Sequence, residues 1–314
     1  MPFIKPPALH PGDRVQVVAP SGPFPRDVFE KGLGDLAQRY APNHEHTIFE
    51  RTRYLAGDDA NRAGQLTRAF TDSSAHAIFA ARGGYGLMRL LPSLQKTLAA
   101  AASHKPVIGF SDITALHLAL QAQGKVSFHA PVLTQLGRQT PELQQRLWRL
   151  LEDSNHPREP LEGIETFVPG TVEGPLIGGN LSVLTRLLGT PYLPDLRGAL
   201  LLLEDVGERP YRLDRMWTHL QLAGVFEQIS GIVLGEFTLC EERDADYGPL
   251  DILRELAHQT GLPCASGFPI GHGEVNEPVP LGVRARLHAP APGSGEKPSL
   301  SFLEPAVSPR PQAT

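Results

Sequence analysis

Short apolar runs alternate with stretches of helical spacing along the first half of this 314-residue chain. The runs Arg14–Pro20, Ala75–Gly86 and Val107–Asp112 each end in a loop and precede a segment whose apolar residues recur every three or four positions. Such alternation is typical of a parallel sheet covered by helices. Ligand sites of these sheets lie outside the carboxyl ends of the strands. The sequence therefore predicts an α/β fold whose loops 20–23, 82–86 and 109–112 form one site.

The chain is long enough for two domains. Residues 152–170 are polar and contain prolines, which is typical of a connection between domains. We predict an N-terminal parallel α/β domain over residues 1–152, a linker over 153–170, and a C-terminal β-rich α/β domain over 171–307. The last residues, 308–314, are expected to be a disordered tail.

Composition excludes several classes of protein. The formal net charge is −5 and the pI is about 6.2, so no general attraction to nucleic acid or anionic lipid is expected. The two cysteines, Cys240 and Cys264, form no metal-ligand pattern and no disulfide framework. No apolar run reaches the length of a membrane span. We expect no metal, no cofactor, no nucleic-acid partner and no membrane partner, and we expect a cytoplasmic protein.

Ser111 stands at a predicted corner between a strand and a helix, in the run Gly109-Phe110-Ser111-Asp112-Ile113. A serine before a helix is commonly an N-cap that accepts a hydrogen bond from the first turn. The alternative is a nucleophile, because the unpaired N–H groups of a helix N-terminus favour an oxyanion. The G-x-S-x-G pattern of hydrolase elbows is not matched, since Ile113 replaces its second glycine.

Two further residues complete a possible set of catalytic groups. Glu204 directly follows five apolar residues, where a buried carboxylate needs a partner. It either caps the next turn, pairs with Arg209 or Arg212, or orients a catalytic base. His272 lies between glycines at a predicted strand end. Ser111, Glu204 and His272 are the residue types of a nucleophile, an orienting acid and a general base.

The glycine-rich loop Ala81–Gly86 has three possible roles. It forms a tight turn, a phosphate cradle, or half of an oxyanion hole in which the amides of Gly84 and Asp112 bind the developing charge. It lacks both common phosphate-loop motifs. Candidate substrate contacts are Arg82, Tyr85 and Asn180, with Arg209 and Arg212 as further cations for a carboxylate; Asn180 is equally a candidate helix cap.

Six separated stretches carry a resemblance to a known family: VVAPSGP, ARGGYGLMRLLP, GFSDITAL, GGNLSVLTRLLGTPYLP, LLLEDVGERPYRLDRM and GHGEVNEPVPLG. Together they span about residues 17–281. The chain resembles the LD-carboxypeptidases, which are serine peptidases of murein recycling, and their relatives that confer immunity to microcin C. Ser111, Glu204 and His272 fall on the family's nucleophile, acid and base, and Gly84 and Asp112 fall on its oxyanion positions.

The resemblance implies a site at the interface of the two domains, a homodimer, and no metal. It implies removal of the terminal D-alanine from a cytoplasmic murein tetrapeptide, at the L,D bond after meso-diaminopimelate. Two alternatives stay open: a microcin-immunity-type serine amidase acting on peptidyl-nucleotides, and an α/β module that binds a nucleotide or phosphate without turnover.

Overall fold

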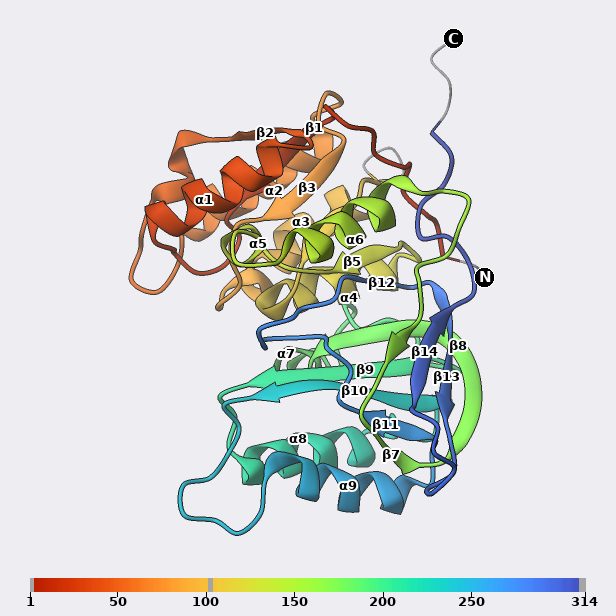
Figure 1. Ribbon diagram of the computed structural model, residues 1–314. Coiled ribbons are helices and arrows are strands. Elements are labelled where there is room, and N and C mark those ends of the chain that lie inside the picture. Colours follow the sequence, from red (N-terminus) through yellow and green to blue (C-terminus); the bar gives the residue numbers. More distant parts are fainter. Residues whose placement is uncertain (1–2, 101–103, 311–314) are drawn as a thin grey trace.

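Two sheets organise the chain, and the computed structural model describes residues 3–100 and 104–310 of it (Figure 1). The first sheet has the strand order β12-β5-β4-β3-β1-β2. Strands β1 to β5 run parallel to their neighbours, and only β12 is antiparallel. The predicted parallel α/β architecture is therefore confirmed. Its strands are β1 (Arg14–Val18), β2 (Ala41–His44), β3 (Ala77–Ala80), β4 (Val107–Gly109), β5 (Ser127–His129) and β12 (Val279–Leu281).

Helices follow the strands of this sheet, as the apolar periodicity predicted. Asp58 and Thr140 accept hydrogen bonds from the first turns of α2 and α6, so both helices begin at a side-chain cap. The helical segments of this half are α1 (Arg26–Ala37), the 3₁₀ helix η1 (His46–Phe49), α2 (Asp59–Thr71), the 3₁₀ helix η2 (Leu87–Leu90), α3 (Leu91–Ala99), the 3₁₀ helix η4 (Ser111–Ile113), α4 (Thr114–Ala122), α5 (Leu133–Leu136) and α6 (Pro141–Glu152).

The second sheet is mixed and has the order β6-β14-β13-β8-β9-β10-β11-β7. Strands β8 to β11 run parallel, and antiparallel strands flank them on both sides. Helices α8 and α9 lie along one face of this sheet (Figure 1). Its elements are β6 (Leu161–Glu162), β7 (Glu165–Val168), β8 (Gly170–Asn180), α7 (Leu181–Arg186), β9 (Leu200–Val206), α8 (Pro210–Leu222), β10 (Gly231–Thr238), α9 (Pro249–Thr260), β11 (Cys264–Ser266), β13 (Arg284–Ala289) and β14 (Ser299–Phe302).

Two of the predicted boundaries differ from the structure. The expected linker 153–170 contains β6 and β7, which pair with β14 and β11 of the second sheet. These strands are short and carry exposed polar residues, so their sequence is typical of a loop. The expected tail begins with ordered contacts: the Ser308 N–H donates to the Pro6 carbonyl, and Arg310 pairs with Asp13. Residues 311–314 of that prediction lie outside the described residues.

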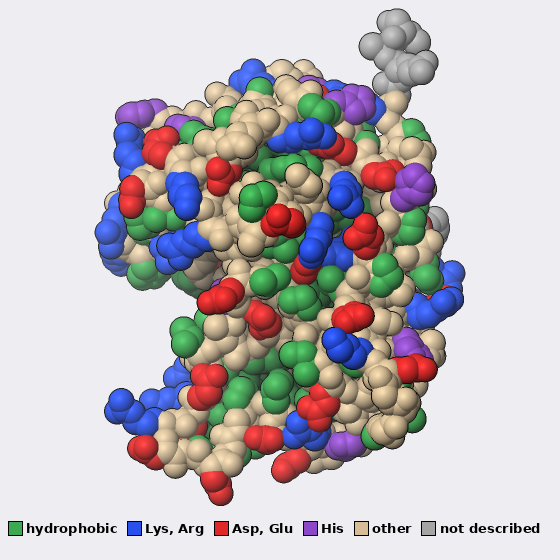
Figure 2. All heavy atoms as spheres, viewed as in Figure 1, with side chains coloured by type: hydrophobic (Ala, Val, Ile, Leu, Met, Phe, Trp, Pro, Cys, Tyr) green, Lys and Arg blue, Asp and Glu red, His purple; other side chains and the backbone are tan. Residues whose placement is uncertain are grey.

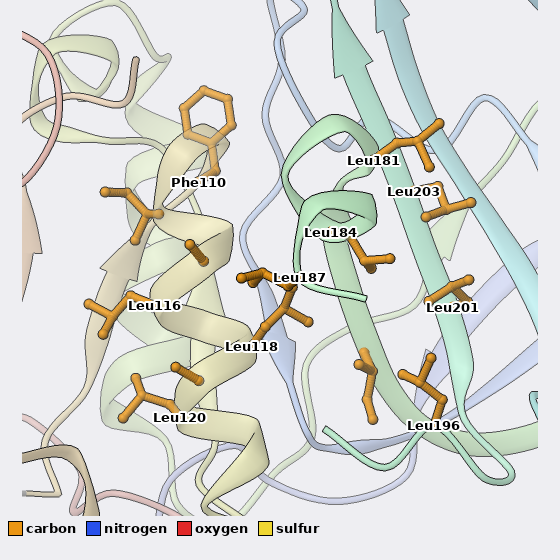
Figure 3. Packing of buried hydrophobic residues seen from close by; sticks show 14 of the residues in the cluster. Phe110, Leu116, Leu118, Leu120, Leu181, Leu184, Leu187, Leu196, Leu201 and Leu203 are labelled. Atoms are coloured by element: carbon orange, nitrogen blue, oxygen red, sulfur yellow. The ribbon is translucent and has the colours of Figure 1, made fainter. Parts of the chain in front are cut away.

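The two halves share one buried interface. In Figure 3, Leu118 of α4, from the first half, points toward the second half and lies beside Leu187, which follows α7. The chain also crosses back between the sheets: residues 267–278, which we call the crossing loop, leave β11 in the second sheet and enter β12 in the first. Because of this crossing, both sheets fix the position of the crossing loop. No helix among the residues described is long and apolar enough to cross a bilayer.

Candidate active site

Ser111 lies at a sharp corner directly after β4. Its φ is +65°, in the left-handed region that side chains other than glycine rarely adopt. Phe110 occupies the N-cap of η4 without a capping bond from its side chain, so the cap interpretation of Ser111 is wrong. The Ser111 hydroxyl has no hydrogen-bond partner within residues 3–100 and 104–310. The corner therefore presents this hydroxyl unpaired.

The glycine loop approaches Ser111 closely. A Cβ on Gly83 would lie 2.7 Å from the Ser111 Cβ and 2.8 Å from its Oγ, so only glycine fits there. Gly84 has a φ of +115°, and its Cβ would lie 3.2 Å from the Cα of Gly22. These contacts explain why two glycines follow Arg82 in the sequence.

Asp112 fastens this loop to the helix that follows Ser111. Its buried carboxylate accepts hydrogen bonds from the Ser21 Oγ (2.5 Å) and the Leu87 N–H (2.9 Å). Burial raises the pKa of Asp112, although the Ser21 and Leu87 hydrogen bonds oppose the shift. The backbone N–H groups of Gly84 and Asp112 have no protein acceptor in the part of the chain described. Both amides are free to bind an oxyanion.

Glu204 and His272 meet at the carboxyl end of β9. The His272 Nδ1 and the Glu204 Oε2 lie 2.7 Å apart, and the Glu204 side chain is completely buried. A Cβ on Gly271 would lie 2.9 Å from the Glu204 Oε2, which explains the glycine before His272. The alternative partners of Glu204 are wrong, because Arg209 pairs with Glu242 and Arg212 with Glu208.

The environment of His272 favours the protonated imidazole. Burial alone lowers its pKa. The hydrogen bond and charge of Glu204, with the charges of Asp205 and Glu236, outweigh burial and raise the pKa above its usual value. A proton taken up by His272 during a reaction is therefore stabilised by neighbouring carboxylates.

Two cavities meet at Ser111. The larger, of about 590 Å³, is lined by Ser111, Phe110 and His272 together with Arg82 and Arg138. The smaller, of about 350 Å³, is lined on the other side of Ser111 by further polar residues. A hollow between the upper and lower parts of the molecule is visible in Figure 2. Residues lining the smaller cavity include Tyr85, Asp112, Asn180, Ser182, Arg186, Asp205 and Glu208.

The candidate substrate residues divide between these cavities. Arg82 lines the larger cavity, and Tyr85 and Asn180 line the smaller one. Asn180 also caps α7, since its Oδ1 accepts from the Val183 N–H. Arg209 and Arg212 line neither cavity.

Three polar groups near the site are not among the predicted site residues. Asp205 accepts hydrogen bonds from the Asn180 side chain (3.0 Å) and the Ser182 N–H (2.8 Å); burial and the charge of Glu204 raise its pKa to about 7. Arg138 lines the larger cavity, and the buried Asn276 accepts a hydrogen bond from the Gly271 N–H, next to His272. Asp205 was detectable as the neighbour of Glu204, whereas the other two depend on contacts between distant segments.

No cluster of three or more metal-ligating side chains occurs among the residues described. The residues brought together are instead an unpaired serine hydroxyl, an imidazole bonded to a buried carboxylate, and two free backbone amides. These are the parts that acyl transfer through a serine requires.

Comparison with known proteins agrees with this chemistry. Residues 15–130 match the model of the LD-carboxypeptidase N-terminal domain, and residues 173–287 match that of the C-terminal domain. A murein tetrapeptide carboxypeptidase of Pseudomonas aeruginosa is 37% identical over 289 residues, covering 87% of this chain and 92% of that protein.

Solved structures of related proteins have the same fold over nearly the whole chain. The muramoyltetrapeptide carboxypeptidase of Oxalobacter formigenes superposes with a TM-score of 0.81 at 29% identity, over 95% of this chain and 100% of that one. The protein MccF in complex with glutamyl sulfamoyl guanosine superposes with a TM-score of 0.85 at 23% identity, over 97% of this chain and 99% of that one. The chain therefore belongs to the LD-carboxypeptidase family of serine peptidases.

Proposed function

We propose that this chain is a serine LD-carboxypeptidase that releases the terminal D-alanine from murein tetrapeptide, cutting the L,D bond after meso-diaminopimelate. The observation that carries the proposal is that His272, hydrogen-bonded to the buried Glu204, lines the same cavity as the unpaired Ser111 hydroxyl. The substrate class comes from the 37% identical relative, which is named for murein tetrapeptide.

In the proposed reaction, the Ser111 Oγ attacks the carbonyl carbon before D-alanine while the His272 Nε2 takes its proton. The charge on the carbonyl oxygen is stabilised by the amides of Gly84 and Asp112. His272 then gives the proton to the leaving nitrogen, so that the C–N bond breaks and an acyl-enzyme remains. Water, activated by the same imidazole, hydrolyses the ester and restores Ser111. Glu204 keeps the Nδ1 proton in place and stabilises the imidazolium.

Incubation of the purified chain with L-Ala-γ-D-Glu-meso-diaminopimelate-D-Ala, followed by mass spectrometry, tests the proposal. The wild-type chain is expected to release one D-alanine, with and without EDTA, and Ser111→Ala is expected to release none. A wild-type chain that leaves this peptide intact would refute the proposed function. Cleavage that persists unchanged in Ser111→Ala would refute the assignment of the nucleophile.

A second substrate distinguishes the amidase alternative. The Microcin C7 self-immunity protein MccF of Escherichia coli is 27% identical over 266 residues, covering 74% of this chain. Aspartyl sulfamoyl adenosine, with which MccF has been solved, is the appropriate probe. Faster cleavage of this compound than of the tetrapeptide would favour the amidase.

We further propose that the chain acts in the cytoplasm as a homodimer. The support is the resemblance to the family, whose substrate is a recycled peptide. Sedimentation velocity of the purified chain tests the assembly, and a single species with the mass of one chain, 34.1 kDa, would refute it.

A further inference from the structure

Two arginines in the larger cavity have no acidic partner. Arg82 and Arg138 form no ion pair within the described residues, although most arginines of the chain do. Arg82 donates from one Nη to the Pro23 carbonyl. The Arg138 guanidinium has no acceptor among residues 3–100 and 104–310, so all of its donors are available.

The backbone that carries Arg138 is held firmly. Its N–H donates to the Gln135 carbonyl at 2.9 Å, which closes the turn between α5 and α6. The preceding residue, Gly137, packs so closely on α1 that a Cβ there would lie 3.1 Å from the Gly32 nitrogen. A cation on a fixed turn is better preorganised for a ligand than one on a mobile loop.

The role of His272 decides which part of the substrate enters this cavity. The imidazole must give its proton to the nitrogen of the leaving amino acid. The leaving group must therefore lie on the side of Ser111 that His272 lines, which is the larger cavity. The acyl part of the peptide then occupies the smaller cavity, whose lining does not include His272.

We propose that Arg138, assisted by Arg82, binds the C-terminal carboxylate of the departing D-amino acid. This inference rests on the proposed function and names the residue that makes the enzyme a carboxypeptidase. Guanidinium and carboxylate form paired charge-assisted hydrogen bonds. A peptide that continued beyond the D-residue would place a neutral amide against Arg138 and lose them.

The experiment compares two substrates that differ only at this carboxylate. They are the tetrapeptide ending in D-alanine and the same peptide ending in D-alanine amide. In the wild-type chain, kcat/KM should be roughly 10–100-fold higher for the acid, as expected for a hydrogen bond to a charged group. In Arg138→Ala, kcat/KM for the peptide acid should fall by about the same factor, and kcat/KM for the peptide amide should change little. Arg138→Gln, which keeps a neutral hydrogen-bond donor on a shorter side chain, should behave in the same way because the charge is absent.

Arg14→Ala is the matched control. Arg14 is exposed, forms no salt bridge among the described residues, and begins β1 at the edge of the sheet opposite the site. It should leave both rates unchanged. An equal loss of kcat/KM for the peptide acid and the peptide amide in the Arg138 variants would refute the carboxylate-binding role of Arg138. The proposed function would still stand. A wild-type chain that cleaves neither peptide would remove the proposed function, and the subsite with it.

Discussion

At the scale of the residue, the backbone of Ser111 is the unusual feature. A φ of +65° costs a residue with a side chain about 1–2 kcal/mol. Such strain persists only where the surroundings hold it, and here the Asp112 carboxylate binds both Ser21 and Leu87. The hydroxyl is thereby aimed at a point between two cavities.

Ser111→Gly and Ser111→Ala should therefore differ in stability although both are inactive. Glycine adopts the left-handed conformation without strain, but it also adds freedom to the unfolded chain. The net expectation is a free energy of unfolding about 0.5–1 kcal/mol higher for Ser111→Gly than for Ser111→Ala. Calorimetric scans of the two variants measure the difference. Identical unfolding temperatures would mean that no strain is stored at this corner.

Glu204→Gln tests the electrostatics of the pair. The base must be neutral to act, so activity falls as pH drops through the pKa of His272, which Glu204 raises. Without that carboxylate, the pKa of His272 falls and the acid limb of the kcat/KM profile moves to lower pH. Turnover at the plateau should fall roughly 10³–10⁴-fold, because the tautomer is no longer fixed.

Glu236→Gln gives a milder change with which the pH profile of Glu204→Gln can be compared. Glu236 raises the pKa of His272 by charge, without a hydrogen bond to the ring. The acid limb of the Glu236→Gln profile should also move to lower pH, but by less than that of Glu204→Gln. The plateau value of kcat/KM should stay within a few-fold of the wild type. A Glu204→Gln profile with an unmoved acid limb would contradict the assigned pair.

At the scale of the element, the crossing loop is held by a buried amide. The Asn276 Oδ1 accepts from the Gly271 N–H, next to His272, and its Nδ2 donates to the Gln135 Oε1; both distances are 3.0 Å. Asn276 is fully buried, and Gln135 lines the larger cavity. Asn276 is therefore a positioning residue that couples the base to the wall of the cavity.

Asn276→Ala should lower kcat by roughly 10–100-fold with little change in KM, because the buried Gly271 N–H and the partly buried Gln135 amide lose their partner and the His272 segment loosens. Asn276→Asp should recover much of the rate. Its carboxylate still accepts from Gly271, and the Gln135 amide can rotate to donate to it. The added charge should also shift the acid limb upward. Steady-state kinetics across pH measure both effects, and an Asp variant as slow as the Ala variant would refute this role.

At the scale of the whole molecule, local patterns predicted the first sheet and the edge where the site lies. Apolar runs such as Val107–Gly109 and Leu200–Leu203 are buried strands, and Ser111 and Glu204, which follow them, both lie next to His272 at one site. The crossing back of β12 was not predictable, since three residues, Val-Pro-Leu, carry no information about which sheet they join. Asn276 and Arg138 were missed for a similar reason, because Gln135, which accepts from Asn276, lies more than a hundred residues away, and Arg138 shares a cavity with residues distant in sequence such as His272.

The assembled halves depend on one buried ion pair as well as on the shared leucine interface. Glu277, at the end of the crossing loop, is 3% exposed and pairs with Arg158 and with Arg146 of α6. Arg158 is itself buried, and burial lowers its pKa to about 10 despite the charge of Glu277. Its Nε also donates to the Pro278 carbonyl at 2.7 Å. Removing Glu277 leaves a buried guanidinium without its counter-ion.

Glu277→Gln should therefore lower the free energy of unfolding by about 3 kcal/mol, the range for breaking a buried pair from one side. Glu304→Gln, which removes the half-exposed partner of Lys5, should cost less than about 1 kcal/mol. Denaturant unfolding followed by circular dichroism compares the two. Because one hydrophobic cluster spans both sheets, each variant should unfold in a single transition. If Glu277→Gln were no less stable than Glu304→Gln, the leucine interface alone would hold the crossing loop in place, and His272 would not depend on this ion pair for its position.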